Sequence, residues 1–197
     1  MKEVLPVCCV ALYAIGPAVG FLRLLRQGFK RSPRLYRITG WRWHIPTLFL
    51  PLEWLLPPLL ILLGIGEIDA DWLPVRVGGF ALAICGAALL AWATAVLGRH
   101  LVHEAAIIEN HVLVITGPYR LVRHPVYSGY LLLLVGSGLA ALNVFVLLLW
   151  PLSLLAILMQ ATFEERLLRA RFAGDYERYV SRVGQLVPSL WRRVICQ

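Results

Sequence analysis

The chain has 197 residues, of which 59% are hydrophobic and 15% charged, and its mean hydropathy is +0.73. Soluble domains are about 45–50% apolar and about 25% charged, so this composition excludes a disordered or collagen-like chain and argues against a soluble domain. A formal net charge of +8 would indicate nucleic-acid binding in a soluble protein. In a membrane protein it follows from the preference of Lys and Arg for cytoplasmic loops, and we expect no nucleic-acid partner.

We expect an all-α fold: one integral membrane domain over residues 1–197, built as a bundle of about five transmembrane helices with a cytosolic C-terminal helical segment. The first span is unlike a cleaved signal peptide because basic residues follow it rather than precede it. The third span is rich in Gly and Ala, which allows close helix packing. The predicted spans cover about 4–22, 45–66, 77–98, 126–142 and 144–163.

The last two spans are predicted as a hairpin. No charged residue occurs from Val126 to Phe163, and one helix of that length would reach about 57 Å, far beyond a hydrocarbon core of ~30 Å. The stretch must therefore fold back. Asn143 is the only strongly polar residue near its middle, so we place the turn there.

The charges between the spans predict the orientation. The segment 23–42 is basic and holds no acid, the segment 67–71 is acidic, and the later segments 99–123 and 166–193 are rich in arginine. This alternation predicts a multi-pass protein with its N-terminus outside and its C-terminus in the cytosol. The membrane would be the inner or plasma membrane in a bacterium and an ER-like membrane in a eukaryote.

The cysteines and histidines predict no metal site. The four cysteines form no CxxC pair, and the histidines are scattered without HxxxH or HExxH spacing. We read the cysteines as small apolar residues.

Two polar segments on the cytosolic side could carry chemistry. In the first, Gly117-Pro118 predicts a turn, and Pro125 is well placed as the first residue of the fourth span. Arg123 and His124 then lie at the N-terminal end of that helix, where free N–H groups and the helix dipole attract anions.

The second segment starts with Glu164 and Glu165, where the fifth span leaves the membrane. Both could pair with nearby arginines on the surface, which contributes little energy, or one could face inward and hold a cation. The hairpin should bring Glu164 close to His124 and Tyr127. An acid opposite an anion-binding helix end suits a zwitterionic ligand.

The run LVITGPYRLVRHPVYSGYLL, followed by EERLLRARFAGDYERY, resembles the isoprenylcysteine carboxyl methyltransferase family and the related phospholipid methyltransferases. The resemblance covers about residues 97–188. It implies transfer of a methyl group from S-adenosylmethionine to a lipophilic acceptor at the cytosolic membrane face, with S-adenosylhomocysteine as the product. It places the cofactor region in about 99–128 and 160–188, with contacts from His111, Val112, Leu113, Val114, Tyr119, His124, Pro125, Val126, Tyr127 and Glu164.

The acceptor stays open: a prenylcysteine-like carboxylate, a lipid amine, or an alkylated phenol or thiol. The prenylcysteine branch of the family has an arginine where this chain has Gln160, so a carboxylate would lack its obvious counter-charge. Gln160 and Glu53 are the candidate substrate-binding residues. Glu53 either faces the acceptor or caps backbone groups freed by Pro57 and Pro58, which should bend or break the second span.

Three residues are catalytic candidates by position alone: Glu165, His124 and Arg123. A phenol, ammonium or thiol acceptor must lose a proton, so a base would help. We also expect the segment from Gly174 to Arg182 to close over the cofactor as a lid.

Two other functions compete with methyl transfer. Membrane sterol reductases, which use NADPH, carry a similar RHPxY stretch, although this chain has no GxGxxG fingerprint. A non-enzymatic membrane scaffold is the third reading, in which the polar clusters are merely interfacial.

Overall fold

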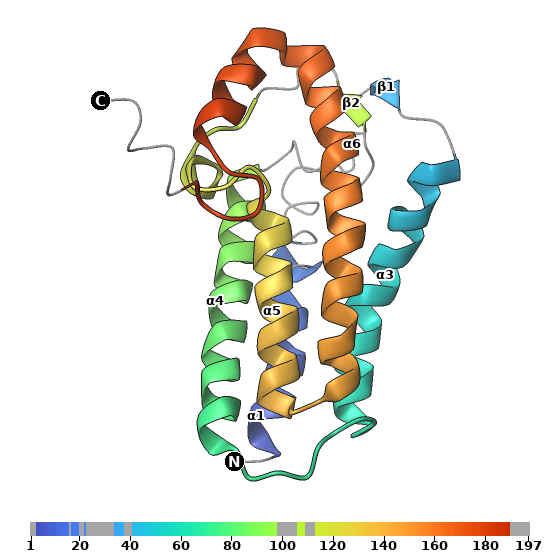
Figure 1. Cartoon of the computed structure of the whole chain (residues 1–197), viewed down its shortest axis with the longest axis vertical. Coiled ribbons are helices and arrows are strands. Elements are labelled where there is room, and N and C mark those ends of the chain that lie inside the picture. Colours follow the sequence, from blue (N-terminus) through green and yellow to red (C-terminus); the bar gives the residue numbers. More distant parts are fainter. Residues whose placement is uncertain are drawn as a thin grey trace.

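A computed structural model describes residues 3–15, 17–19, 22, 34–37, 41–97, 106–108 and 113–189, with the backbone alone for 34–37, 41–51 and 106–108. Long helices run side by side along the longest axis, and the C-terminal part of the last helix folds back over one end (Figure 1). The elements are α1 (Val4–Tyr13), β1 (Arg34–Arg37), α3 (Trp41–Leu62), α4 (Leu73–Leu97), β2 (Ala106–Ile108), the 3-10 helix η2 (Gly117–Arg120), α5 (Pro125–Ala141) and α6 (Val144–Arg182).

The predicted spans coincide with helices, and two of these, α4 and α6, are long and apolar enough to cross a membrane. Shorter apolar helices cover Val4–Val19, Leu52–Leu62 and Pro125–Ala141, so the count of five spans remains a prediction. Large apolar side chains are at least half exposed on the outside of the bundle, which suits hydrocarbon surroundings: Leu55, Leu59, Leu148, Leu152 and Leu155.

The fold is mostly helical, as expected, but it is not purely so. β1 and β2 form a short antiparallel ribbon in which Arg34 pairs with Ile108 and Arg37 with Ala106. Four and three residues are too few to show a clear alternation of polar and apolar side chains, and neither strand was predicted from the sequence.

The fifth span is predicted to end at residue 163 and to be followed by a C-terminal helical segment, and in the structure one helix, α6, carries both and continues to Arg182. Residues 164–182 are rich in Glu, Arg, Leu and Ala, which are strong helix formers. Glu164 and Glu165 consequently lie in mid-helix rather than at a helix C-terminus, where acids are disfavoured. The helix is kinked at Ala173, whose φ of 40° is left-handed.

Of the bend or break predicted for the second span at Pro57 and Pro58, a break does not occur, because α3 continues to Leu62. Pro57 has no N–H for the carbonyl of Glu53 four residues earlier. That carbonyl accepts a hydrogen bond from the Tyr130 hydroxyl at 3.0 Å instead. A neighbouring helix thus supplies the donor that the proline removes, as is common in membrane helices.

Four glycines bring α4 and α5 into backbone contact. A Cβ built on Gly86 would lie 2.4 Å from the Leu133 nitrogen, and one on Gly79 would lie 2.5 Å from the Ala140 nitrogen. Gly129 and Gly136 approach the opposite helix just as closely. Small residues let membrane helices pack at short range, so this pair forms a rigid support for the start of α5.

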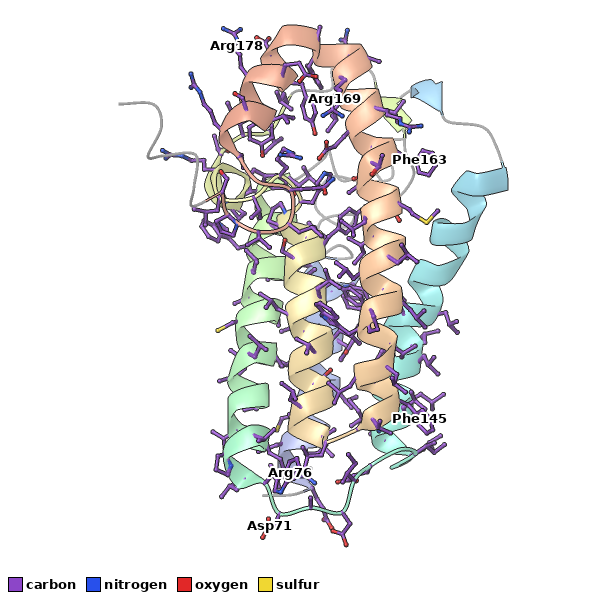
Figure 2. All side chains as sticks on the ribbon, viewed as in Figure 1. Asp71, Arg76, Phe145, Phe163, Arg169 and Arg178 are labelled. Atoms are coloured by element: carbon purple, nitrogen blue, oxygen red, sulfur yellow. The ribbon has the colours of Figure 1, made fainter. Side chains whose placement is uncertain are left out.

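The turn between α5 and α6 lies at Asn143, as predicted. Leu142 takes a left-handed conformation (φ 48°), and the Asn143 side chain accepts from the Val146 N–H at 3.1 Å and donates to the Ile65 carbonyl at 2.9 Å. Arg76 is buried here and binds Glu67 (3.1 Å) and the Ala140 carbonyl (3.2 Å). Figure 2 shows Arg76 and Asp71 at this end, and Arg169 and Arg178 at the opposite end.

Candidate active site

The candidate site lies at the end of the bundle that carries residues 113–128 and 164–189. The segment before α5 reaches it through η2, which begins at Gly117 with a φ of 59°. A Cβ at Gly117 would also lie 2.9 Å from Val96, so glycine is required for both conformation and space. Pro118 and Tyr119 are buried behind this turn.

His124 precedes α5 and lies between two carboxylates of α6. Its Nδ1 is 3.5 Å from Oε2 of Glu164, and its Nε2 is 3.3 Å from Oε1 of Glu165. The imidazole stacks on the Tyr127 ring at 5.5 Å, and the Tyr127 hydroxyl donates to Glu164 at 2.5 Å. The hairpin therefore does bring Glu164 to His124 and Tyr127, as the sequence predicts.

Glu165 is buried and surrounded by hydrogen-bond donors. Its Oε1 accepts from Arg123 Nε (3.0 Å) and Nη2 (2.8 Å) and from Gln185 Nε2 (3.2 Å), while Arg169 lies 3.4 Å from its other oxygen. Burial alone would raise the pKa of Glu165, but hydrogen bonds from His124 and Arg123 outweigh it and lower the pKa to about 2. A carboxylate held in this way is a poor base at neutral pH.

The same network favours the protonated form of His124. Burial disfavours the imidazolium, but the hydrogen bonds and negative charges of Glu164 and Glu165 outweigh it, so the pKa of His124 is raised. An imidazolium donates from both nitrogens, which matches the two acid partners. In this form, both ring N–H groups of His124 are engaged by the two carboxylates.

The C-terminal segment 183–186, which we call the strap, is bound to the site through its backbone. The N–H groups of Arg123 and His124 donate to the carbonyls of Gly184 (2.8 Å) and Gln185 (3.0 Å), and the Ser128 hydroxyl donates to the Leu186 carbonyl (2.7 Å). Gly184 has no room for a side chain, because its Cβ would lie 2.0 Å from a carbonyl oxygen. The strap therefore covers the start of α5.

Arg123, a candidate for binding anions, is satisfied within the protein. Its guanidinium donates to Glu165 through two nitrogens and to the Val183 carbonyl through the third, at 2.5 Å. It thus joins α5, α6 and the strap. Glu164, by contrast, is about a quarter exposed and remains the carboxylate best placed to meet a ligand.

Comparison with known proteins places the chain in a family. The family model for phospholipid methyltransferases matches residues 75–175, about half of the chain. This chain belongs to the phospholipid methyltransferase family. The predicted resemblance is thereby confirmed.

Curated relatives carry methyltransferase names. The chain is 33% identical over 129 residues to a probable protein-S-isoprenylcysteine O-methyltransferase of Oryza sativa subsp. japonica, covering 62% of this chain and 65% of that protein. It is 32% identical over 120 residues to protein-S-isoprenylcysteine O-methyltransferase B of Arabidopsis thaliana, covering 56% and 57%. The match thus spans less than two thirds of these relatives.

One solved structure has a similar fold. The structure of the eukaryotic intramembrane Ras methyltransferase ICMT, an isoprenylcysteine carboxyl methyltransferase, matches with a TM-score of 0.51 and 23% identity, over 75% of this chain and 48% of that one. Identity this low supports the shared fold alone, which agrees with the mostly helical architecture.

Most of the other residues predicted to contact the cofactor lie near the start of α5, and two lie in a segment that the structure does not describe. Leu113, Val114 and Tyr119 lie on the segment leading to α5, and Pro125 and Val126 begin that helix. His111 and Val112 lie outside the described residues. The cofactor-binding roles stay predictions.

The two candidate substrate residues are far apart. Gln160 is buried one turn before Glu164, with its Nε2 3.5 Å from Glu164 Oε1 and its own Oε1 without a hydrogen-bond partner among the described residues. Glu53 lies deeper in the bundle, beside Ser153, which precedes Gln160 by seven residues.

The strap falls within the predicted cofactor region 160–188, but Gln185 received no role of its own. The strap lies beyond the matched range of the family model, and a glutamine in a short polar tail carries no signal of its own. Tyr179, in the quoted DYERY run, was visible but received no role; its hydroxyl donates to the Tyr119 carbonyl at 2.6 Å.

Proposed function

We propose that the chain transfers a methyl group from S-adenosylmethionine to a lipophilic acceptor at the cytosolic face of a membrane. The observation that carries this proposal is the meeting of His124, Tyr127 and Glu164 at one end of the bundle, in a chain of the phospholipid methyltransferase family. The names of the curated relatives support the same reaction.

The residues present fit the cationic part of this cofactor. S-adenosylmethionine carries an ammonium and a sulfonium, and its role when bound is to supply the methyl group. Glu164 is the partly exposed carboxylate that would hold the ammonium. The cofactor carboxylate would face the start of α5, since Arg123 is already bound.

The chain itself aligns the reactants and keeps water out. Methyl transfer from a sulfonium is a single displacement, which depends on alignment and exclusion of water. The strap closes over the start of α5, and the Arg123–Glu165 pair fixes that helix start to α6. Glu165 acts in this scheme as a positioning residue rather than as a base, and Arg123 acts likewise.

The acceptor group that fits best is a hydrogen-bond donor such as an amine, phenol or thiol. Gln160 offers an unsatisfied oxygen, and no Lys or Arg occurs between Arg123 and Arg166 in the sequence. Arg123 binds Glu165 and therefore offers no free cation to a carboxylate acceptor beside Gln160. Desolvating an unpaired carboxylate is costly, so methyl esterification fits less well.

Two measurements test the proposal. Calorimetry on the purified protein should show binding of S-adenosylhomocysteine and none of NADPH, which separates it from a reductase. Incubation of membranes with labelled S-adenosylmethionine and extracted lipids should yield a methylated lipid whose structure names the acceptor. A protein that binds neither compound, and loses nothing in Glu164→Ala, would be a scaffold instead.

A further inference from the structure

Glu164 is the carboxylate that both His124 and the ammonium of the proposed methyl donor would bind. In the structure, Nδ1 of His124 lies 3.5 Å from Oε2 of Glu164. The other partners of Glu164 among the described residues are neutral, namely the Tyr127 hydroxyl and the Gln160 amide. In this part of the chain, a protonated His124 is therefore the only counter-charge in contact with Glu164.

Glu165, the second carboxylate beside His124, is balanced without the imidazole. Arg123 donates to it through two nitrogens, at 3.0 and 2.8 Å, and Arg169 lies 3.4 Å from its other oxygen. Figure 2 shows Arg169 at this end of the bundle, on α6. Guanidinium groups do not lose their charge in proteins. The positive charge of His124 thus mainly serves Glu164.

The remaining ionisable groups around this cluster cannot replace the charge of His124. They are phenols from three elements: Tyr119 of η2, Tyr127 of α5, and Tyr176 and Tyr179 of α6. Phenols have an ordinary pKa of about 10 and stay neutral near pH 7. The strap, residues 183–186, contributes only backbone, aliphatic and amide groups. Further out, Glu177 is already bound to Arg169 at 2.9 Å.

A ligand ammonium at Glu164 would place a second positive charge beside the imidazolium. His124 is 7% exposed, so water screens the repulsion between the two cations poorly. Loss of one ring proton removes this conflict. A neutral imidazole can keep its Nε2–H on Glu165, 3.3 Å away, and leave Nδ1 as an acceptor on the side of Glu164. Glu165 stays balanced by Arg123 throughout.

We propose that binding of the methyl donor at Glu164 expels the Nδ1 proton of His124, so that the donor ammonium replaces the imidazolium as the counter-charge of this carboxylate. The proton passes to the buffer, and Glu164 stays ionised. The inference rests on the proposed function, which places the ammonium at Glu164. It makes donor binding sensitive to pH, because acidification favours the empty, protonated site.

Calorimetry counts the released protons without any methyl transfer. S-adenosylhomocysteine, which carries the same ammonium, is titrated into the full chain in detergent, in phosphate and in Tris at the same pH. Tris takes up a proton with a much larger heat than phosphate, so the difference in binding enthalpy measures the release. We expect release of up to about one proton per ligand, and an affinity that rises several-fold between about pH 6 and 8. Equal heats in the two buffers, or an affinity that falls with pH, would overturn the proposal.

A second ligand tests whether the ammonium is the cause. 5′-Methylthioadenosine shares the adenosine and the thioether of S-adenosylhomocysteine but lacks the amino-acid part. It should bind without releasing a proton, and its affinity should not change with pH. Equal release by the two ligands would contradict a competition at Glu164. This comparison uses the unmodified protein, so it does not depend on the folding of any variant.

Two variants assign the proton to a residue. In His124→Gln, the difference between buffers and the dependence on pH should both disappear. Tyr179→Phe is the matched control, because it removes a neighbouring ionisable group that binds the Tyr119 carbonyl, and it should release protons as the wild type does. The unfolding temperature of each variant checks its fold. Undiminished release by His124→Gln would place the proton elsewhere and overturn the proposal.

The same titrations separate this inference from the proposed function. If the folded protein binds no S-adenosylhomocysteine at any pH, the proposed function fails and the proton release fails with it. If S-adenosylhomocysteine binds with equal heats in phosphate and Tris, the proposed function stands and the proton release alone is wrong.

Discussion

Tyr130 donates its hydroxyl hydrogen to the carbonyl oxygen of Glu53 at 3.0 Å, and this is the carbonyl that Pro57 leaves without a helical partner. The bond links α5 to α3 at the level of Glu53. It also supplies the donor that Pro57 removes from α3. The ring of Trp54 packs against Tyr130 at 5.3 Å and against Tyr13 at 6.1 Å, which holds the hydroxyl in place.

Replacing Tyr130 by Phe should lower the free energy of unfolding by about 1–3 kcal/mol, because it leaves a buried carbonyl unsatisfied. Thermal or denaturant unfolding in detergent measures the change. In a Pro57→Ala background the same replacement should have a smaller effect, since residue 57 then supplies its own N–H. Equal losses in both backgrounds would mean that the hydroxyl does not serve this carbonyl.

The contact of α4 with α5 should be intolerant of a single added methyl group. Gly86→Ala places a Cβ 2.4 Å from a backbone nitrogen, and overpacking of this kind costs about 1–3 kcal/mol. Gly78→Ala is the matched control on the same helix, because a Cβ there meets nothing within 4 Å. The two variants should therefore differ in unfolding temperature, with only Gly86→Ala destabilised.

The two adjacent glutamates should have separable roles. Glu164→Gln should leave folding nearly intact and weaken binding of S-adenosylhomocysteine about tenfold or more, as the loss of a charge-assisted contact of about 1.5–3 kcal/mol implies. Glu165→Gln should destabilise the protein by about 3–5 kcal/mol, because it leaves Arg123 buried without its partner. Calorimetry and unfolding, measured on both variants, test this assignment. A folding defect in Glu164→Gln, or none in Glu165→Gln, would reverse it.

The free energy of unfolding should be highest between about pH 4.5 and 6.5 and should fall at both lower and higher pH. The pKa of Glu165 is lowered to about 2 in the folded state, so its contribution is complete above its ordinary pKa of 4.5 and is lost as the pH falls toward 2. The pKa of His124 is raised above 6.5, so its contribution is complete below 6.5 and is lost as the pH rises through the folded value. Unfolding across this range should show the alkaline decline, and His124→Gln should remove it.

The strap should be required for cofactor binding but not for membrane insertion. Truncation after Phe172 removes Gly184, Gln185 and Tyr179, and with them the backbone bonds to Arg123 and His124. Binding of S-adenosylhomocysteine should then be abolished while the chain still partitions into membranes. Truncation after Ser189 is the control, because it keeps the strap. Normal binding by the shorter chain would contradict a covering role.

Sequence reasoning succeeded where one local pattern dictated the geometry. A long uncharged stretch with a single central asparagine has one simple way to fold, and that hairpin brings Glu164 to His124. It failed where partners come from distant segments. Nothing in the neighbourhood of Gln185 predicts a bond to Glu165, and nothing near Glu53 indicates that its carbonyl meets Tyr130. The sequence indicated a helical segment after residue 163, but not that it continues the preceding helix as one element with its kink at Ala173.

The strap follows α6 in the chain, yet its partners Arg123 and His124 precede α5. Translation therefore produces the two halves of this contact on either side of the whole hairpin. The start of α5 therefore stays uncovered until α5, α6 and the kink at Ala173 have been synthesised. Completion of the site is thus a late event in biogenesis, because the strap is synthesised after both helices of the hairpin.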